Sequence, residues 1–486
     1  MEPTTLRRRP SVRYLRSVTR PAPSGLLALA HRPYERLAFS AVVAFAAFAC
    51  KAKPKPPPQN PAPSASVSAE PAASAAPEAT AHCKSLSETA SLRVGEAERS
   101  RAPAGEDEDE LDEAALPFAT RVDAAVALDD AFAVGGLETR GGKTEAFVGW
   151  VPLGGGNGKR LGLGTVHGDV DPPLVAGRGN LLVAAVSDMD AAGGMLRVHR
   201  LDPATDKPSG DVSITGVEHD AGAALAVDAQ GAVLVFGAKR AQGVVLKLAY
   251  LDPAALKGSP ETRELEHTLH AESPALFARS GGFWLAWISE QPAKPPVDAG
   301  VRPDAAPPSD ESDAPLVSSG PRVLYALPLD IHGKPTGLGI PRAVSAEKAR
   351  VLGFEAAVMP DGRLALAYRE DESSPGSEHA PPDLARIGLD GAIERAKIED
   401  EDLSAGLPAL LADPRPGGRV WLALESASGG TRVGLLKAEP LGLESLVGDR
   451  LLRGAEVLAA SSGALLVSRN RGRAVELDVI ECKPSP

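Results

Sequence analysis

Cysteine is scarce in this 486-residue chain, which contains only Cys50, Cys83 and Cys482 and no Cys-x-x-Cys pair. This spacing excludes the clustered ligands of a structural zinc site and the paired thiols of thioredoxin-like chemistry. The usual hydrolase motifs are absent as well, because neither a Gly-x-Ser-x-Gly elbow nor a His-Glu-x-x-His pair occurs. We therefore expect no metal, no cofactor and no catalytic residues, and we favour a binding role over an enzymatic one.

Positive charge is in deficit: 52 Lys and Arg residues face 64 Asp and Glu residues, for a formal net charge of −12. Nucleic-acid affinity comes mainly from Lys and Arg side chains that neutralise phosphates, so a nucleic-acid partner is excluded. Aromatic residues make up 4% of the chain, whereas apolar residues make up 43% and charged residues 24%. The last two values are typical of a soluble globular protein with a buried core.

A hydrophobic run, LAFSAVVAFAAFA, covers residues 37–49 and follows an N-terminal arm with eight arginines. As a helix it would span about 20 Å, short of the roughly 30 Å hydrocarbon core of a membrane. The run therefore predicts the hydrophobic region of a signal sequence over residues 1–50. An uncleaved short anchor is the alternative.

The residues that end this run, Ala47-Phe48-Ala49-Cys50, resemble the lipobox of bacterial lipoproteins. The resemblance implies lipidation of Cys50, export, and anchoring of the chain in the membrane of the cell envelope, on its periplasmic or surface face. The alternative is a signal peptide or anchor that ends in a free cysteine. Residues 51–82 are rich in Pro, Ala and Ser, a composition that predicts an extended tether between the anchor and a folded domain.

If Cys50 carries lipid, Cys83 and Cys482 remain as a pair at the two ends of the folded part. In an oxidising compartment we expect them to form a disulfide. Two unrelated buried thiols are the alternative.

One pattern repeats through the body of the chain: an apolar strand, a turn and a second aliphatic strand. The turn glycines are 52, 51, 80, 56 and 45 residues apart, and the longest interval contains an insertion. These glycines are Gly179, Gly231, Gly282, Gly362, Gly418 and Gly463. A weaker copy begins at Asp130 and precedes the others, which gives seven copies.

A unit of about fifty residues with three or four short strands is typical of a β-propeller blade. The repeats resemble those of bacterial β-propeller proteins in general, over about residues 120–482. We predict an all-β propeller over residues 83–486 with about seven four-stranded blades, six or eight being alternatives. Residues 85–94 are expected to supply the strand that closes the ring. Recurrent Leu-Asp pairs after the third strands predict Asx-type turns.

Two segments interrupt the pattern: a disordered acidic segment over residues 101–115 and a proline-rich insertion over residues 291–320 within the fourth blade.

The stretch GGGNGKR at residues 154–160 lacks the Ser or Thr of a phosphate loop, and we expect it to connect two blades. Metal binding is the less favoured interpretation of three polar stretches. The first comprises Glu264, Glu266, His267, His270 and Glu272. The other two, residues 168–171 and residues 188–190 with Gly193, each have a faint similarity to calcium-binding propeller repeats.

Trp284, Trp287 and Trp421 lie in apolar second strands, so burial between blades is favoured over stacking on a ligand.

The function best supported is that of a lipid-anchored envelope module for binding or assembly. We expect it to be a monomer and to have an envelope protein or a glycan as its partner. Its ligand-binding residues are unknown. One alternative is a glycosidase-like hydrolase whose carboxylates converge from different blades, and another is a structural lipoprotein without a ligand.

Overall fold

The computed structural model describes residues 82–87, 91–95, 120–179, 181–190, 193–202, 205, 207–252, 256–290, 320–337, 339–371, 382–398, 406–415, 417–426, 430–444, 446–471 and 474–483. The predicted signal sequence (1–50) and the acidic segment (101–115) lie outside these residues. So do all but the last residue of the tether (51–82) and of the insertion (291–320).

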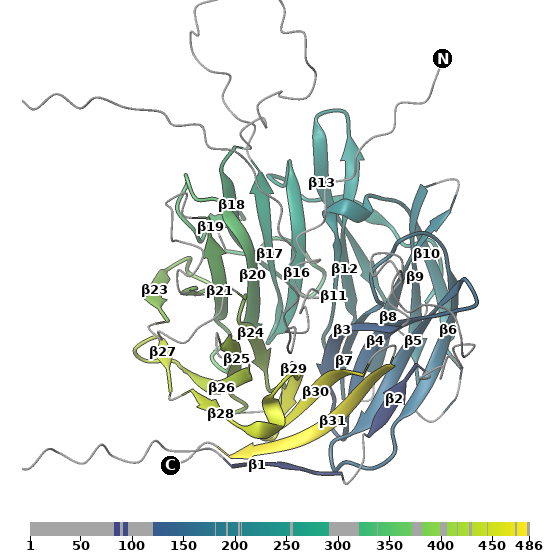
Figure 1. Cartoon of the computed structure of the whole chain (residues 1–486). Helices are drawn as coiled ribbons and strands as arrows, with labels where there is room; N and C mark the ends of the chain where they lie inside the picture. Colours follow the sequence, from purple (N-terminus) through teal and green to yellow (C-terminus); the bar gives the residue numbers. More distant parts are fainter. Residues whose placement is uncertain are drawn as a thin grey trace, which may run out of the picture. The chain divides into compact units, whose positions relative to one another are not determined.

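Seven sheets, in which every strand pair but one is antiparallel, make up the described part of the chain and confirm the predicted seven-bladed β-propeller. The first strand of each blade lies near the centre in Figure 1, and each first strand contacts the next, so that the seven form a closed ring. In blade order they are β3 (Thr120–Ala127), β7 (Leu174–Arg178), β11 (Ala223–Val227), β16 (Ala271–Arg279), β20 (Val351–Val358), β24 (Ala409–Ala412) and β29 (Glu456–Ser461).

The second strands carry the aliphatic repeats found in the sequence: β4 (Ala131–Arg140), β8 (Leu181–Asp190), β12 (Ala232–Arg240), β17 (Gly282–Glu290), β21 (Leu364–Glu370), β25 (Val420–Ser426) and β30 (Ala464–Arg471). The third strands follow: β5 (Lys143–Pro152), β9 (Gly193–Leu201), β13 (Gly243–Leu251), β18 (Arg322–Leu329), β22 (Asp383–Ile387), β26 (Gly430–Lys437) and β31 (Ala474–Lys483).

The outer strands are shorter and more varied. They are β6 (Lys159–Val166), β10 (Ser209–Val217) with β14 (Lys257–Gly258), β15 (Thr262–Glu264), β19 (Arg342–Ala343), β23 (Ile393–Lys397), and β27 (Gly442–Leu443) with β28 (Val447–Gly448). Two short 3₁₀ helices, η4 (His219–Ala221) and η7 (Arg450–Leu452), lie between blades. Among the residues described, no helix is long and apolar enough to cross a membrane.

Both faces of each blade are buried, and this explains why the second strands are continuously apolar. Val233 and Val235 of β12 pack toward blade 4, whereas Leu234 and Phe236 pack toward blade 2. The described residues form seven such hydrophobic clusters, one at each contact between neighbouring blades. Alternate side chains of a strand point to opposite faces, so a strand packed between two blades carries apolar residues at consecutive positions.

The three tryptophans of the second strands lie in these clusters, as predicted. Trp284 is buried between blades 4 and 5, Trp287 between blades 3 and 4, and Trp421 between blades 6 and 7. The indole N–H of Trp284 also donates a hydrogen bond to the carbonyl of Gly362, 2.9 Å away, and so links two blades.

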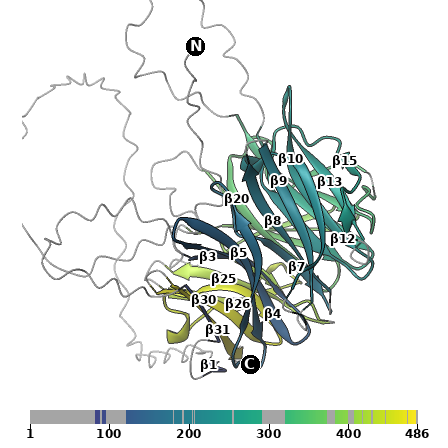
Figure 2. The same ribbon diagram turned by 90° about the vertical axis from the view of Figure 1, so that its right-hand side faces the viewer.

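The seventh blade is completed by the N-terminal part of the domain. β1 (His82–Ser85) and β2 (Leu92–Val94) both pair with β31, and Figures 1 and 2 show β1 beside β31. Cys83 lies directly opposite Cys482 in this pairing, and the two form a disulfide. The predicted closure by residues 85–94 is confirmed for β2, whereas the other closing strand, β1, begins before that segment and shares only Ser85 with it.

Each blade has turns at two ends, which define two faces of the propeller. We call the face with the first-to-second and third-to-fourth strand turns the hairpin face. Predicted Asx-type turns lie there: Asp330 accepts backbone N–H groups of His332 and Lys334 at 2.9 and 2.7 Å, and Asp390 accepts that of Ala392 at 3.0 Å. Residues 154–160 were expected to connect two blades, but they join β5 to β6 within blade 1.

Candidate ligand pocket

The ring of first strands is built mainly from alanine, valine and leucine, as in AALAV of β11 and ALLA of β24. Carboxylates are few on these strands: Asp123, Glu272, Glu355 and Glu456 each lie on a different blade. Glu272 accepts a hydrogen bond from Nε of Arg322 at 2.8 Å, so this carboxylate is held in an ion pair.

Two glutamates of the polar stretch at residues 264–272, considered above as metal ligands, form ion pairs with different arginines. Glu264 pairs with Arg240, and Glu272 pairs with Arg322. His267 and His270 have positive φ angles of 62° and 60° in the connection from β15 to β16. No group of three or more potential metal-ligating side chains occurs among the residues that the structure describes.

The acidic stretches at residues 168–171 and 188–190 approach each other at one point, where the N–H of Met189 donates to the carbonyl of His167 at 3.1 Å. Asp188 is buried and accepts hydrogen bonds from the backbone N–H of His167 at 2.9 Å and from its ring Nδ1 at 3.0 Å. Arg197 approaches the other carboxylate oxygen at 3.4 Å. Asp188 of blade 2 therefore holds its strand against the segment that follows β6 of blade 1.

A cavity of about 590 Å³ opens on the hairpin face between blades 6 and 7. The turn from β24 to β25 and the turn from β29 to β30 form its rim, while Trp421 and Leu435 supply apolar lining from adjacent strands of blade 6. The described residues that line it are Asp413, Arg415, Gly417, Gly418, Arg419, Trp421, Leu435, Ser462 and Gly463. This volume is within the range of pockets that hold small molecules.

Asp413 is the centre of the polar rim, and its carboxylate is fixed by four hydrogen bonds. Arg415 donates to it from the backbone N, from Nε and from Nη2, at 3.2, 3.0 and 2.8 Å. The backbone N–H of Ser462 donates from blade 7 at 2.9 Å. Ser462 has a φ of 60° and is followed by Gly463 with a φ of 79°, the positive φ pair of a tight hairpin turn.

These contacts decide the charge of the pocket carboxylate. Burial alone would raise the pKa of Asp413, but hydrogen bonds from the Arg415 side chain and from the backbone N–H groups of Ser462 and Arg415 outweigh it and hold this pKa below its usual value. The Asp413 side chain is 7% exposed, whereas that of Arg415 is 41% exposed. Asp413 is thus an ionised structural acceptor, and Arg415 faces solvent.

A second guanidinium belongs to the same rim. Arg419 forms an ion pair with Glu444 through Nη2 and is 47% exposed. A guanidinium has five N–H donors, so both arginines keep donors beyond those used on their carboxylate partners. The pocket therefore combines two accessible guanidinium groups with an apolar lining.

Sequence reasoning had predicted only that Trp421 is buried, and it had missed the polar residues of this pocket. The signal available was the turn at residues 413–419, DPRPGGR, which is longer than its counterpart in blade 3 at residues 228–231 and carries two arginines. Nothing in the sequence placed Ser462 beside it.

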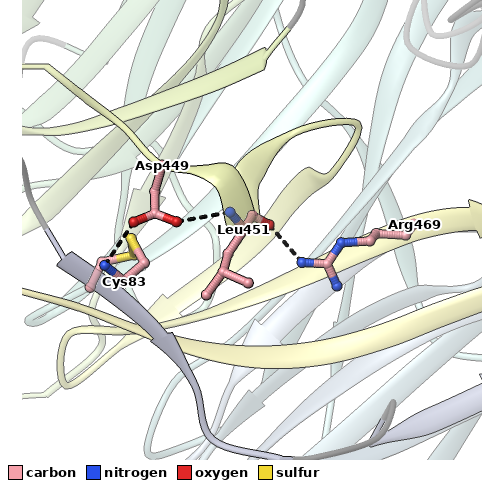
Figure 3. Close-up of a disulfide and its surroundings, with 5 residues drawn as sticks. Cys83, Asp449, Leu451 and Arg469 are labelled. Carbon is pink, nitrogen blue, oxygen red and sulfur yellow. Dashed lines mark hydrogen bonds between the residues drawn. A yellow bond between two sulfur atoms is a disulfide. The ribbon is translucent and has the colours of Figure 1, made fainter.

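The pocket adjoins the disulfide strand. The N–H of Cys482 donates to the carbonyl of Gly463 at 2.9 Å, and Cys482 and Trp421 belong to the same hydrophobic cluster. On the other side of the disulfide, one Asp449 carboxylate oxygen accepts the N–H of Cys83, while the other accepts that of Leu451 (Figure 3). Arg469 donates to the Leu451 carbonyl at 2.6 Å, as the same view shows.

The fold defines the chain as a seven-bladed β-propeller whose last blade is completed by N-terminal strands. No protein-family model matches the sequence, and no curated protein matches it. Among solved structures it is similar to hydrazine synthase of Kuenenia stuttgartiensis, at 12% identity and a TM-score of 0.45, over 77% of this chain and 98% of that one.

Two further similarities are to proteins of Pyrococcus. The β-propeller domain of the Trilobed protease of Pyrococcus furiosus aligns at 11% identity and a TM-score of 0.44, over 75% of this chain and 97% of that one. The acylaminoacyl peptidase of Pyrococcus horikoshii aligns at 11% identity and the same TM-score, over 74% of this chain and half of that one. The assignment of the fold rests on the strand pairing itself.

Proposed function

We propose that this chain is an exported, lipid-anchored β-propeller that acts as a binding module at the bacterial cell envelope. The observation that carries the proposal is the Cys83–Cys482 disulfide. Disulfides persist in oxidising compartments outside the cytosol, so the bridge agrees with the lipobox-like residues before Cys50. A tether over residues 51–82 would let the propeller extend beyond the lipid headgroups.

The pocket between blades 6 and 7 supports binding over hydrolysis. Glycosidase-like hydrolysis requires two carboxyl groups that flank one bond and differ in protonation. This pocket has one carboxylate in its lining, Asp413, and that group is ionised and held by four hydrogen bonds. A carboxylate in this state has no proton to donate and little basicity, but it positions Arg415 well.

Lipidation of Cys50 and export are tested by the intact mass of protein from the membrane fraction, measured with and without reductant. We expect the mass of a chain that begins at Cys50 and carries acyl groups, with one disulfide that reduction opens. The matched variant C50S should lose the acyl mass and leave the membrane fraction, and C83S should keep the acyl mass. A full-length, unacylated chain with a free Cys83 in the soluble fraction would overturn the proposal.

A further inference from the structure

The glycine-rich turn of blade 1 contacts the N-terminal segment that completes blade 7. This turn, GGGNG at residues 154–158, joins β5 to β6, and we call it the glycine turn. The N–H of Gly158 donates to the carbonyl of Ser91 at 2.5 Å, and the N–H of Gly156 donates to Oγ of Ser87 at 3.2 Å. Both acceptors belong to the closing segment, by which we mean residues 86–94, described at 86, 87 and 91–94. The glycine turn thus binds oxygen atoms of this same chain.

Glycine is required in this turn because two stretches of backbone lie close together. A Cβ on Gly158 would lie 2.9 Å from Cβ of Leu92 and 3.0 Å from the carbonyl oxygen of Ser91. Carbon atoms in favourable contact are about 3.5–4.0 Å apart, so a side chain here would push the closing segment away. A Cβ on Gly154, in the same turn, would have no described atom within 4 Å. Only part of the turn therefore depends on the close approach.

The closing segment is also held from the side of blade 7. β2 pairs with β31, and the buried Ser91 donates its N–H to Asp478 of β31 at 3.3 Å. Leu92 packs against the hydrophobic cluster between blades 7 and 1. The closing segment is therefore bound by two blades at once, through contacts that use neither Cys83 nor Cys482.

We propose that the glycine turn is a latch that keeps the ring closed when the Cys83–Cys482 disulfide is reduced. The two fastenings act on different states of the chain. A disulfide stabilises mainly by restricting the unfolded chain, whereas the latch binds the closing segment in the folded propeller. The contact between blades 7 and 1 is then complete before the disulfide forms as well as after. This inference goes beyond the proposed binding function and does not depend on lipidation of Cys50.

The test is hydrogen–deuterium exchange of the full-length protein with and without reductant, followed at residues 91–94 and at β17 of blade 4 as a reference for global unfolding. We expect the wild type to keep residues 91–94 protected after reduction. Reduced G158A should exchange these amides about tenfold faster or more, because the added methyl group displaces the closing segment, and β17 should keep its rate. G154A is the matched control, since it adds the same group where no described atom is near, and should behave as the wild type.

A second variant separates the latch from blade 1 itself, because a Cβ on Gly158 would also lie 2.7 Å from the carbonyl oxygen of Trp150. S87A adds no atoms and removes the acceptor of the Gly156 N–H. After reduction it should raise the exchange rate of residues 91–94 about fivefold, the effect of one lost hydrogen bond. Loss of protection in the reduced wild type would overturn the proposal. Equal exchange of reduced G154A with either G158A or S87A would overturn it as well.

Discussion

The carboxylate of Asp449 binds the backbone of Cys83 across 366 residues of sequence, at 3.1 Å. The same side chain accepts the N–H of Leu451 at 2.8 Å and so caps η7. One residue between blades 6 and 7 thus orders the connection to the last blade and holds the N-terminal strand that completes it. Hydrogen bonds to a charged acceptor are stronger than neutral ones, which makes this contact a sensitive point of the closure.

Replacing Asp449 tests the contribution of these two hydrogen bonds. We expect D449A to lower the free energy of unfolding by about 1–3 kcal/mol, because two partly buried N–H groups lose an ionised acceptor. The shift in the urea midpoint of unfolding measures this loss of stability. D390A removes an exposed turn carboxylate that accepts the backbone N–H of Ala392, and it should cost less. Equal midpoints for the two variants would show that Asp449 has no special part in closure.

The disulfide closes a loop with a sequence separation of 399 residues, so its loss should be costly. The chain-entropy model gives an upper value of about 6 kcal/mol for a loop of this length. We expect the C83S/C482S double variant, or reduction of the wild type, to lower the urea midpoint strongly. C50S is the matched control, since it removes a cysteine outside the bridge. A double variant as stable as C50S would contradict the closing role.

His199 should make stability depend on pH. It is 7% exposed, and within the described part of the chain its Nε2 has no hydrogen-bond partner. Burial, aided by Arg197 and opposed by Asp211 and a backbone hydrogen bond with Gly210, lowers the pKa of His199 below the usual value of about 6.5. The unfolded chain therefore binds a proton at a higher pH than the folded one, and this contribution to stability is lost as the pH falls below about 6.5.

The variant H199L should remove that contribution. We expect urea midpoints measured between pH 7.5 and pH 5, a range that spans the ordinary His pKa of about 6.5, to fall less for H199L than for the wild type. H332Q changes an exposed histidine and should keep the wild-type slope. The same slope in H199L and in the wild type would assign the pH dependence to other groups.

The two tryptophans of β17 form a natural comparison. Trp284 donates its indole N–H to Gly362 of the next blade, whereas Nε1 of Trp287 has no partner among the described residues and its ring stacks on Tyr325. We expect W284F to destabilise the propeller by about 1–2 kcal/mol more than W287F, because it leaves a carbonyl of the blade contact without its donor. Chemical denaturation of both variants measures the difference, and a larger cost for W287F would contradict it.

The blades were predictable from the sequence because their signal is local. When both faces of a sheet are buried, the second strand carries apolar residues at consecutive positions, and stretches such as AVLVF at residues 232–236 show this directly. The Asx-type turns at Asp330 and Asp390 were also predictable, since the side chains accept backbone N–H groups within four residues.

The pocket was not predictable, because it joins residues that are close only after the ring has formed. Asp413 and Ser462 lie 49 residues apart, in turns of different blades, and their hydrogen bond depends on how blades 6 and 7 pack. The sequence alone predicted the blade repeat, its apolar composition and the candidate cysteine pair, whereas the structure decided that the blades are seven and that the cysteines are bonded. Only the tertiary structure decided which turns meet and which arginines face solvent together, because contacts between separate sheets depend on packing and leave no period in the chain.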